Sequence, residues 1–137
     1  MHYTLFADGG SRGNPGIAGA GALVKDAHGE VIIEISEYLG HTTNNVAEYT
    51  GVLRALETLA ERLGEDANKA TVAISMDSEL VVKQMKGIYK IKHPNLKPLA
   101  EKLHALLPLF HEVTFTHVRR EFNKEADALA NQAMDRG

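Results

Sequence analysis

Four acidic residues of this sequence stand where carboxylates could hold a cation, namely Asp8, Glu48, Asp77 and Asp127. Asp8 and Asp77 each follow a short apolar run that is typical of a buried strand. If the two strands are parallel neighbours, about 5 Å apart, both carboxylates emerge at one edge of the sheet, where open α/β sheets bind ligands. Glu48 and Asp127 each fall in the first turn of a predicted helix and are able to close on the same crevice. Four clustered acids without a basic partner would repel one another strongly, so either some of them are protonated or a metal ion neutralises them.

Each acid also has an explanation that involves no ligand. Asp8 precedes Gly9, a pair that is common in turns, and Asp77 is placed to cap a helix. Glu48 and Asp127 lie near helix N-termini, where a negative charge stabilises the helix dipole. The hypothesis of a shared site therefore depends on all of these acids meeting at one place.

The residue types restrict the chemistry that such a site performs. There is no cysteine, so a metal has only oxygen or histidine ligands, and carboxylates favour a hard ion such as Mg²⁺ or Mn²⁺. Pairs of these ions, about 4 Å apart, promote phosphodiester cleavage. The sequence contains neither a Gly-x-Ser-x-Gly nucleophile turn nor a phosphate-binding loop that ends in Gly-Lys-Ser/Thr.

The pattern of apolar residues predicts one α/β domain over residues 1–137. Alternation and turn residues predict three strands joined as an antiparallel meander, the first of which ends at Ala7 and leads into a glycine-rich loop. A helical period from Thr43 to Leu63 precedes a continuous apolar strand, which we expect to pair in parallel with the first strand. The predicted elements are strands at 1–7, 17–26, 30–37, 71–76 and 113–118 and helices at 43–63, 78–87, 95–107 and 124–134.

Charge is distributed unevenly along the chain. The net charge is −3, yet residues 1–82 hold 5 Lys and Arg against 12 Asp and Glu, whereas residues 83–137 hold 10 against 6. The second half is therefore able to face a polyanion, although a solvated helix face explains the same lysines. The sequence shows no apolar run of membrane-spanning length and no basic-then-apolar leader, so we expect a cytoplasmic protein without a membrane partner.

Several segments together resemble the signature blocks of type 1 ribonuclease H, in the order of that family. The blocks are residues 3–10 (YTLFADGG), 13–16 (GNPG), 42–48 (TTNNVAE), 75–78 (SMDS) and 123–130 (NKEADALA). Each block alone is weakly specific, but their joint occurrence over nearly the whole chain is highly specific.

The resemblance implies a ribonuclease H-like fold: a five-stranded mixed sheet, three antiparallel strands followed by two parallel ones, with helices on both faces. It implies a monomeric endonuclease, with no obligate protein partner, that hydrolyses the RNA strand of RNA–DNA hybrids with two Mg²⁺ ions, for which Mn²⁺ substitutes, and that leaves 5′-phosphate and 3′-hydroxyl ends. It makes Asp8, Glu48, Asp77 and Asp127 the metal-binding catalytic acids. By the same resemblance the hybrid backbone and its 2′-hydroxyls contact Gly9, Gly10, Ser11, Asn14, Asn44 and Asn45.

Two departures from the best-known bacterial pattern are visible. Where that pattern has a mobile loop with a histidine, this sequence has Val118 to Glu121, and we expect Arg120 to interact with the scissile or product phosphate. The connector from Gly87 to Pro98 is too short for a separate basic helix that grips the hybrid in some members, so we assign the chain to the branch without that protrusion.

Three other functions remain as alternatives. A binding module without catalysis would have no use for four repelling acids. A DNA-directed nuclease or transposase-like enzyme fits the block at 42–45 less well, and a small phosphatase would not need the basic stretch from 83 to 102.

Overall fold

A computed structural model describes residues 1–137, which form one five-stranded sheet in the order β3-β2-β1-β4-β5. The meander is antiparallel, and β4 pairs in parallel with both β1 and β5, so the predicted mixed sheet is confirmed. The strands are β1 (His2–Arg12), β2 (Gly16–Lys25), β3 (Val31–Thr42), β4 (Thr71–Met76) and β5 (Glu112–His117). The helices are α1 (Asn44–Leu63), α2 (Glu79–Met85), α3 (Lys97–Leu106) and α4 (Lys124–Arg136), with 3₁₀ turns at Gly64–Lys69, Leu107–Leu109 and Arg120–Phe122.

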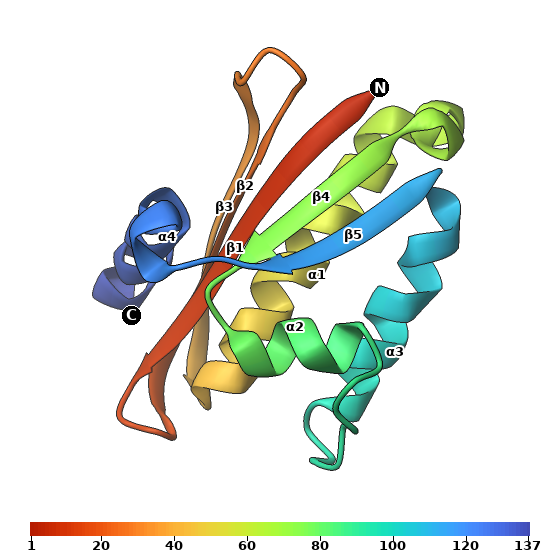
Figure 1. Ribbon diagram of the computed structural model, residues 1–137. Coiled ribbons are helices and arrows are strands. Elements are labelled where there is room, and N and C mark those ends of the chain that lie inside the picture. Colours follow the sequence, from red (N-terminus) through yellow and green to blue (C-terminus); the bar gives the residue numbers. More distant parts are fainter.

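The helices cover the two faces of the sheet unequally. In Figure 1, α1, α2 and α3 lie on one side and α4 lies alone on the other. The larger core belongs to the three-helix side: it includes Leu5, Leu56, Ile74 and Leu103, and it contains no residue of α4. Burial of this apolar surface is the main source of stability for the sheet and its helices. No helix of the structure is both long and apolar enough to cross a membrane.

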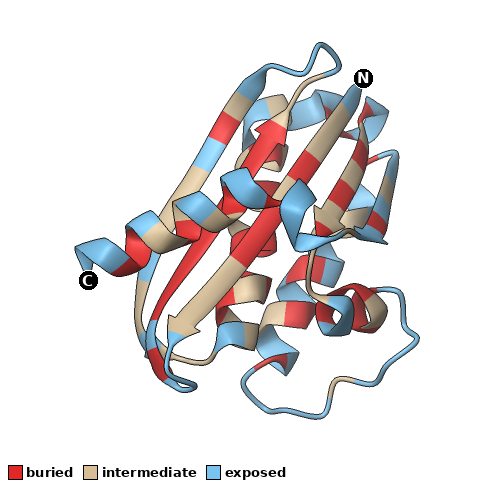
Figure 2. Cartoon of the chain, turned by 60° about the vertical axis from the view of Figure 1, so that its left-hand side comes forward, coloured by how far each residue is buried: buried red, intermediate tan, exposed pale blue.

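The small residues of β2 allow α4 to lie close to the sheet. A Cβ atom added to Gly21 would lie 2.3 Å from the Ala126 carbonyl oxygen, and one added to Gly19 would lie 2.7 Å from that of Ala130. Figure 2 shows α4 crossing the sheet, with buried and exposed stretches alternating along the helix. The close approach explains why glycines stand inside a strand that they would otherwise weaken.

Helix α1 begins and ends where its sequence signals predict. Thr43 is the N-cap, and its hydroxyl accepts a hydrogen bond from the Val46 backbone N–H at 3.3 Å. Gly64 follows the last residue with a φ of 55°, which a residue with a side chain rarely adopts. Because the helix starts at Asn44, Glu48 lies in the second turn, and its predicted place in the first turn is wrong.

Two further boundaries differ from the sequence prediction. Strand β1 does not end at Ala7 but continues to Arg12, because its glycines still pair with β2, for example Gly9 with Ala20. The predicted glycine loop is thus reduced to the turn at 13–15. At α2, the cap is Ser78, whose hydroxyl accepts from the Val81 N–H at 3.3 Å, so Asp77 is free of that role.

Candidate active site

Three of the predicted acids meet at the carboxyl end of β4, beside the point in β1 where the pairing with β4 stops. Ala7 pairs with Met76 in the parallel register, so the residues that follow them, Asp8 and Asp77, emerge side by side. Glu48 arrives from α1, whose backbone passes so close that a Cβ on Gly9 would lie 2.3 Å from the Glu48 nitrogen. One ligand oxygen from each of the three carboxylates lies within 4.8 Å of the others.

Asp127 completes the cluster from the opposite face of the sheet. It lies in the first turn of α4, and its carboxylate accepts a hydrogen bond from the Asn131 side chain at 3.3 Å. It also lines the same surface hollow as the other three acids. The residues that line this hollow are Asp8, Gly9, Gly10, Ser11, Asn44, Glu48, Asp77, Arg120 and Asp127, all of which the sequence analysis singled out.

Burial and mutual repulsion perturb the cluster electrostatically. Desolvation, the Asp77 charge and the contact with Asp127 raise the pKa of Asp8 from 3.8 to about 8. Desolvation first, and then the Asp77 charge, raise the pKa of Glu48 to about 7 against the opposing effect of the Ser78 hydroxyl. These carboxyls are held where their charged forms are unfavourable unless a positive charge is supplied.

The donor set fits a hard divalent cation. All four candidate ligands are carboxylates, three of them converge within 4.8 Å, and the structure contains no cysteine. The nearest side-chain cation is Arg120, whose Nε lies 3.7 Å from the Asp77 Oδ2 while 87% of its side chain is exposed. Because the Arg120 guanidinium is exposed to water, it neutralises the negative charge of the acids only weakly. A cation of higher charge density would stabilise their ionised forms more strongly.

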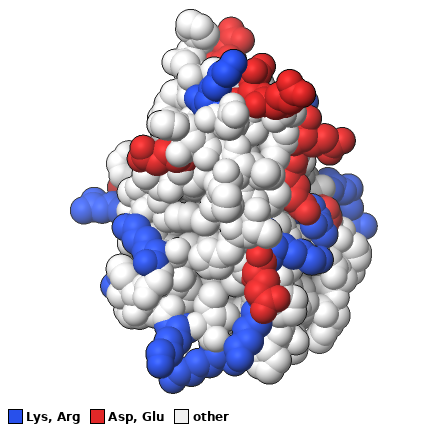
Figure 3. All heavy atoms as spheres, turned by 90° about the vertical axis from the view of Figure 1, so that its right-hand side faces the viewer, with Lys and Arg blue, Asp and Glu red and all other residues white.

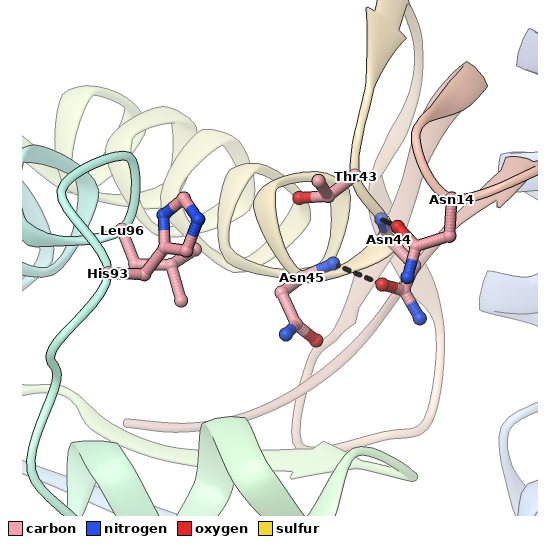
Figure 4. A pocket seen from close by; sticks show the side chains of 6 residues that line it. All are labelled: Asn14, Thr43, Asn44, Asn45, His93 and Leu96. Atoms are coloured by element: carbon pink, nitrogen blue, oxygen red, sulfur yellow. Dashed lines mark hydrogen bonds between the residues drawn. The ribbon is translucent and has the colours of Figure 1, made fainter.

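The predicted contacts to substrate divide between two neighbouring hollows. Gly9, Gly10, Ser11 and Asn44 line the hollow with the acids. Asn14 and Asn45 instead line an adjacent pocket at the start of α1, together with Asn44, Thr43, His93 and Leu96 (Figure 4). Asn44 therefore borders both hollows and links them.

The asparagines of the second pocket hold one another in place. The Asn14 Oδ1 accepts from the Asn44 backbone N–H at 3.3 Å, and the Asn44 Oδ1 accepts from the Asn45 N–H at 3.0 Å, as the dashed lines of Figure 4 mark. The amide groups of Asn14 and Asn44 consequently keep their side-chain N–H donors free for other acceptors.

Charge is unevenly distributed on the side of the molecule that carries α3 and the connector before it. Figure 3 shows Lys and Arg gathered at the lower end of this face and Asp and Glu toward the upper end. No helix lies between Met85 and Lys97, so Lys86, Lys90 and Lys92 are carried by turns and extended backbone, close in sequence to the α2 helix that follows Asp77.

One residue of the site was overlooked in the sequence. Asn123 is 1% exposed, and its side-chain nitrogen donates to the Ala7 carbonyl at 2.9 Å and to the Asp77 Oδ1 at 3.4 Å. The pattern assigned residues 119–123 to a loop, where a polar residue needs no explanation. The signal available was its place immediately before α4, four residues before Asp127.

The raised pKa values predict how stability depends on pH in a chelating buffer. Between about pH 4 and pH 8 the carboxyl of Asp8 is ionised in the unfolded chain but still protonated in the folded protein. The unfolded state therefore binds fewer protons, and the free energy of unfolding falls as the pH rises through this window; Glu48 adds to the effect between its ordinary pKa and about 7. Melting temperatures recorded in EDTA between pH 4.5 and 8.5 measure this fall in stability.

The Asp8→Asn variant isolates this contribution from that of the histidines. Because Asn has no proton to lose, we expect the variant to melt higher than the wild type at pH 8.5, by roughly 5 °C. We expect the difference to vanish near pH 4. Parallel melting curves for the two proteins across the pH range would show that the Asp8 carboxyl is not perturbed.

Comparisons with known proteins agree with this geometry. A protein family described as reverse transcriptase-like matches residues 6–133. A bifunctional protein of Mycobacterium tuberculosis is 48% identical over 136 residues, which are 98% of this chain and 36% of that protein. A ribonuclease H of Chlorobium phaeobacteroides is 35% identical over 146 residues, covering 96% of this chain and 94% of that protein.

A solved structure is similar over the same range. The crystal structure of an RNase H1 isolated from compost, in complex with an RNA/DNA hybrid, has a TM-score of 0.91 and 43% identity, and covers 98% of this chain and 97% of that chain. This chain spans about a third of the length of the mycobacterial relatives that it matches, 36% in each case.

Proposed function

The chain belongs to the ribonuclease H family, and on that premise we propose that it is an endonuclease that hydrolyses the RNA strand of RNA–DNA hybrids, leaving 5′-phosphate and 3′-hydroxyl ends. The observation that carries the proposal is the convergence of Asp8, Glu48 and Asp77 within 4.8 Å where the parallel pairing of β1 and β4 ends. The hybrid bound to the similar compost enzyme supports the choice of substrate.

The family is metal dependent, and the acidic cluster of this chain has the donors that such a metal needs. We assign Asp8, Glu48, Asp77 and Asp127 to two Mg²⁺ ions, for which Mn²⁺ substitutes. Bound divalent ions stabilise the negative charge that develops on the phosphate during hydrolysis. The raised pKa of Asp8, about 8, supports this assignment, because a cation at the site would favour the ionised carboxylate.

The residues around the acids are suited to hold a nucleic-acid backbone. The Gly9 N–H donates to the Asp8 Oδ1 at 2.9 Å and fixes the orientation of that carboxylate. Beside it, Gly10 and Ser11 offer a surface without bulky side chains, and Asn14, Asn44 and Asn45 offer amide groups that are able to pair with a 2′-hydroxyl. A contact to the 2′-hydroxyl is the physical means of telling RNA from DNA.

Arg120 is assigned to the phosphate that is cut or released. Its guanidinium borders the hollow, whereas Arg119 points to Glu121, with 3.8 Å between the charged atoms, and does not line the hollow. We expect Arg120→Ala to lower kcat by about tenfold to a hundredfold without changing the melting temperature, because an exposed side chain adds little to stability. Steady-state kinetics on hybrid measure the effect, with Arg119→Ala as the matched control. Equal kinetics for the two variants would remove Arg120 from the site.

We further propose that the 137 residues are a single domain that acts as a cytoplasmic monomer. One continuous sheet and one principal core, drawn from β1 to β5, support a single domain. The lack of cysteine supports a reducing compartment.

The deciding experiment is incubation of the protein with labelled RNA–DNA hybrid, duplex RNA and duplex DNA. Each substrate is tested with Mg²⁺, with Mn²⁺ and with EDTA, and the ends of the products are identified. The expected result is internal cleavage of the RNA strand of the hybrid only when a divalent ion is present. Cleavage of duplex DNA in place of hybrid, or cleavage in EDTA, would overturn the proposal.

A further inference from the structure

The buried residue Asn123 makes hydrogen bonds to, or next to, three of the four acids. The Asn123 side-chain nitrogen donates to the carbonyl of Ala7, the residue before Asp8, and to the carboxylate of Asp77. The Asn123 backbone carbonyl accepts from the Asp127 N–H at 3.1 Å, within the first turn of α4. Asn123 thus connects β1, the end of β4 and the helix that covers the other face of the sheet.

The orientation of this amide is determined by its surroundings. Both side-chain partners are oxygens that only accept, so the N–H end must face them. The amide oxygen, Oδ1, is buried and has no hydrogen-bond partner. An unpaired buried acceptor is unfavourable, so a stability argument alone would favour an apolar residue here. We therefore attribute the presence of an amide at this position to its N–H donor, which binds Ala7 and Asp77.

The acids themselves would not hold this arrangement. The negative charges of Asp77 and Asp127 both oppose ionisation of Asp8, and Asp77, which follows β4, is separated along the chain from Asp127 on α4 by α2, α3 and β5. A donor between Ala7 and Asp77 opposes their separation, and the same residue starts the helix that brings Asp127. Groups that orient metal ligands in this way typically affect metal affinity or activity 10- to 100-fold.

From this connection we propose that Asn123 is a positioning residue, which holds Asp77 and the start of α4 at the separation from Asp8 that a cation requires. The inference rests on the proposed function only through the cation site. The role of Asn123 is distinct from that of Arg120, which is exposed and lines the hollow that contains the acids.

The test is titration of Asn123→Leu with Mn²⁺ by calorimetry in the absence of nucleic acid, so that no readout depends on cleavage. Leucine is close in size and removes both the donor and the unpaired acceptor. We expect the affinity for the cation to fall by about 10- to 100-fold while the protein remains folded by circular dichroism. On hybrid, the Mg²⁺ concentration for half-maximal rate should rise similarly, with KM for the hybrid nearly unchanged at saturating Mg²⁺.

Gln84→Leu is the matched control. Gln84 is also a buried amide, 7% exposed, but its partner is the Tyr49 hydroxyl at 2.7 Å and it does not contact the acids. We expect this variant to melt lower and to bind Mn²⁺ as the wild type does. If Asn123→Leu does not fold, Asn123→Ala, which removes the donor without adding bulk or charge, is titrated in its place.

The outcomes separate the two proposals. Wild-type affinity, within twofold, in the folded Asn123 variant, or an equal loss in Gln84→Leu, would overturn the positioning role. A wild-type protein that binds Mn²⁺ but cleaves no hybrid would overturn the proposed function and leave the positioning role in place.

Discussion

Replacement of Asp77 by Asn is expected to lower the rate of hybrid cleavage by about 10³-fold or more, which corresponds to the several kcal/mol that a metal site contributes to a phosphoryl transition state. Asp77 is the acid whose charge raises the pKa of both Asp8 and Glu48, so it is the centre of the electrostatic cluster. The amide of Asn keeps the shape but provides neither the charge nor two equivalent ligand oxygens.

The same substitution is expected to leave folding intact. Removal of one negative charge relieves repulsion within the cluster, so the melting temperature in EDTA at pH 8 should be equal to or higher than that of the wild type. Asp66→Asn is the control, because Asp66 is exposed and pairs only with Lys69 at 3.5 Å. Near-normal cleavage by folded Asp77→Asn, measured on labelled hybrid, would contradict the assignment of the site.

The second large effect is expected from Gly9→Ala. A Cβ at this position would lie 2.2 Å from the Ala47 carbonyl carbon and 2.3 Å from the Glu48 nitrogen, and both atoms belong to the backbone. Helix α1 must therefore shift away from β1, which we expect to reduce the free energy of unfolding by about 3 kcal/mol. The shift moves Glu48 away from Asp8, so we expect the rate of hybrid cleavage to fall even under conditions in which the variant is still fully folded.

Gly10→Ala provides the comparison for that experiment. A Cβ on Gly10 would meet only the methyl end of the Met134 side chain, at 3.4 Å, and that side chain is flexible. We expect a change of less than about 1 kcal/mol in urea unfolding for this variant. Equal midpoints for the two glycine variants would show that the contact between β1 and α1 is looser than described.

Asp8 and Asp77 were predictable because the two strands that carry or precede them, and their parallel pairing, can be recognised from the sequence. The apolar runs before Asp8 and Asp77 have the length and composition of buried strands, and a helix between them required a parallel pairing. Once Ala7 and Met76 are paired in parallel, the next residues, Asp8 and Asp77, must lie side by side, even though β1 continues beyond Asp8. No comparable rule predicts the position of Glu48 from the sequence, because that position depends on the tight packing of α1 against Gly9.

The extent of β1 and the role of Asn123 were not predictable in the same way. Glycine has low strand propensity, and only the pairing with Ala20 and Gly19 of β2 keeps Gly9 and Gly10 in the strand. Asn123 donates to a residue 116 positions away, and sequence patterns that rest on local spacing contain no information about such a contact.

The acids lie far apart in the sequence, and this bears on the order in which the site is assembled. Asp8 is synthesised before Asp127, which is brought to it only when α4 docks on the glycines of β2. A nascent chain that still lacks this helix has an incomplete cation site, even if the meander has already formed. The proposed cation site is therefore complete only once α4 has been synthesised and has docked on the sheet.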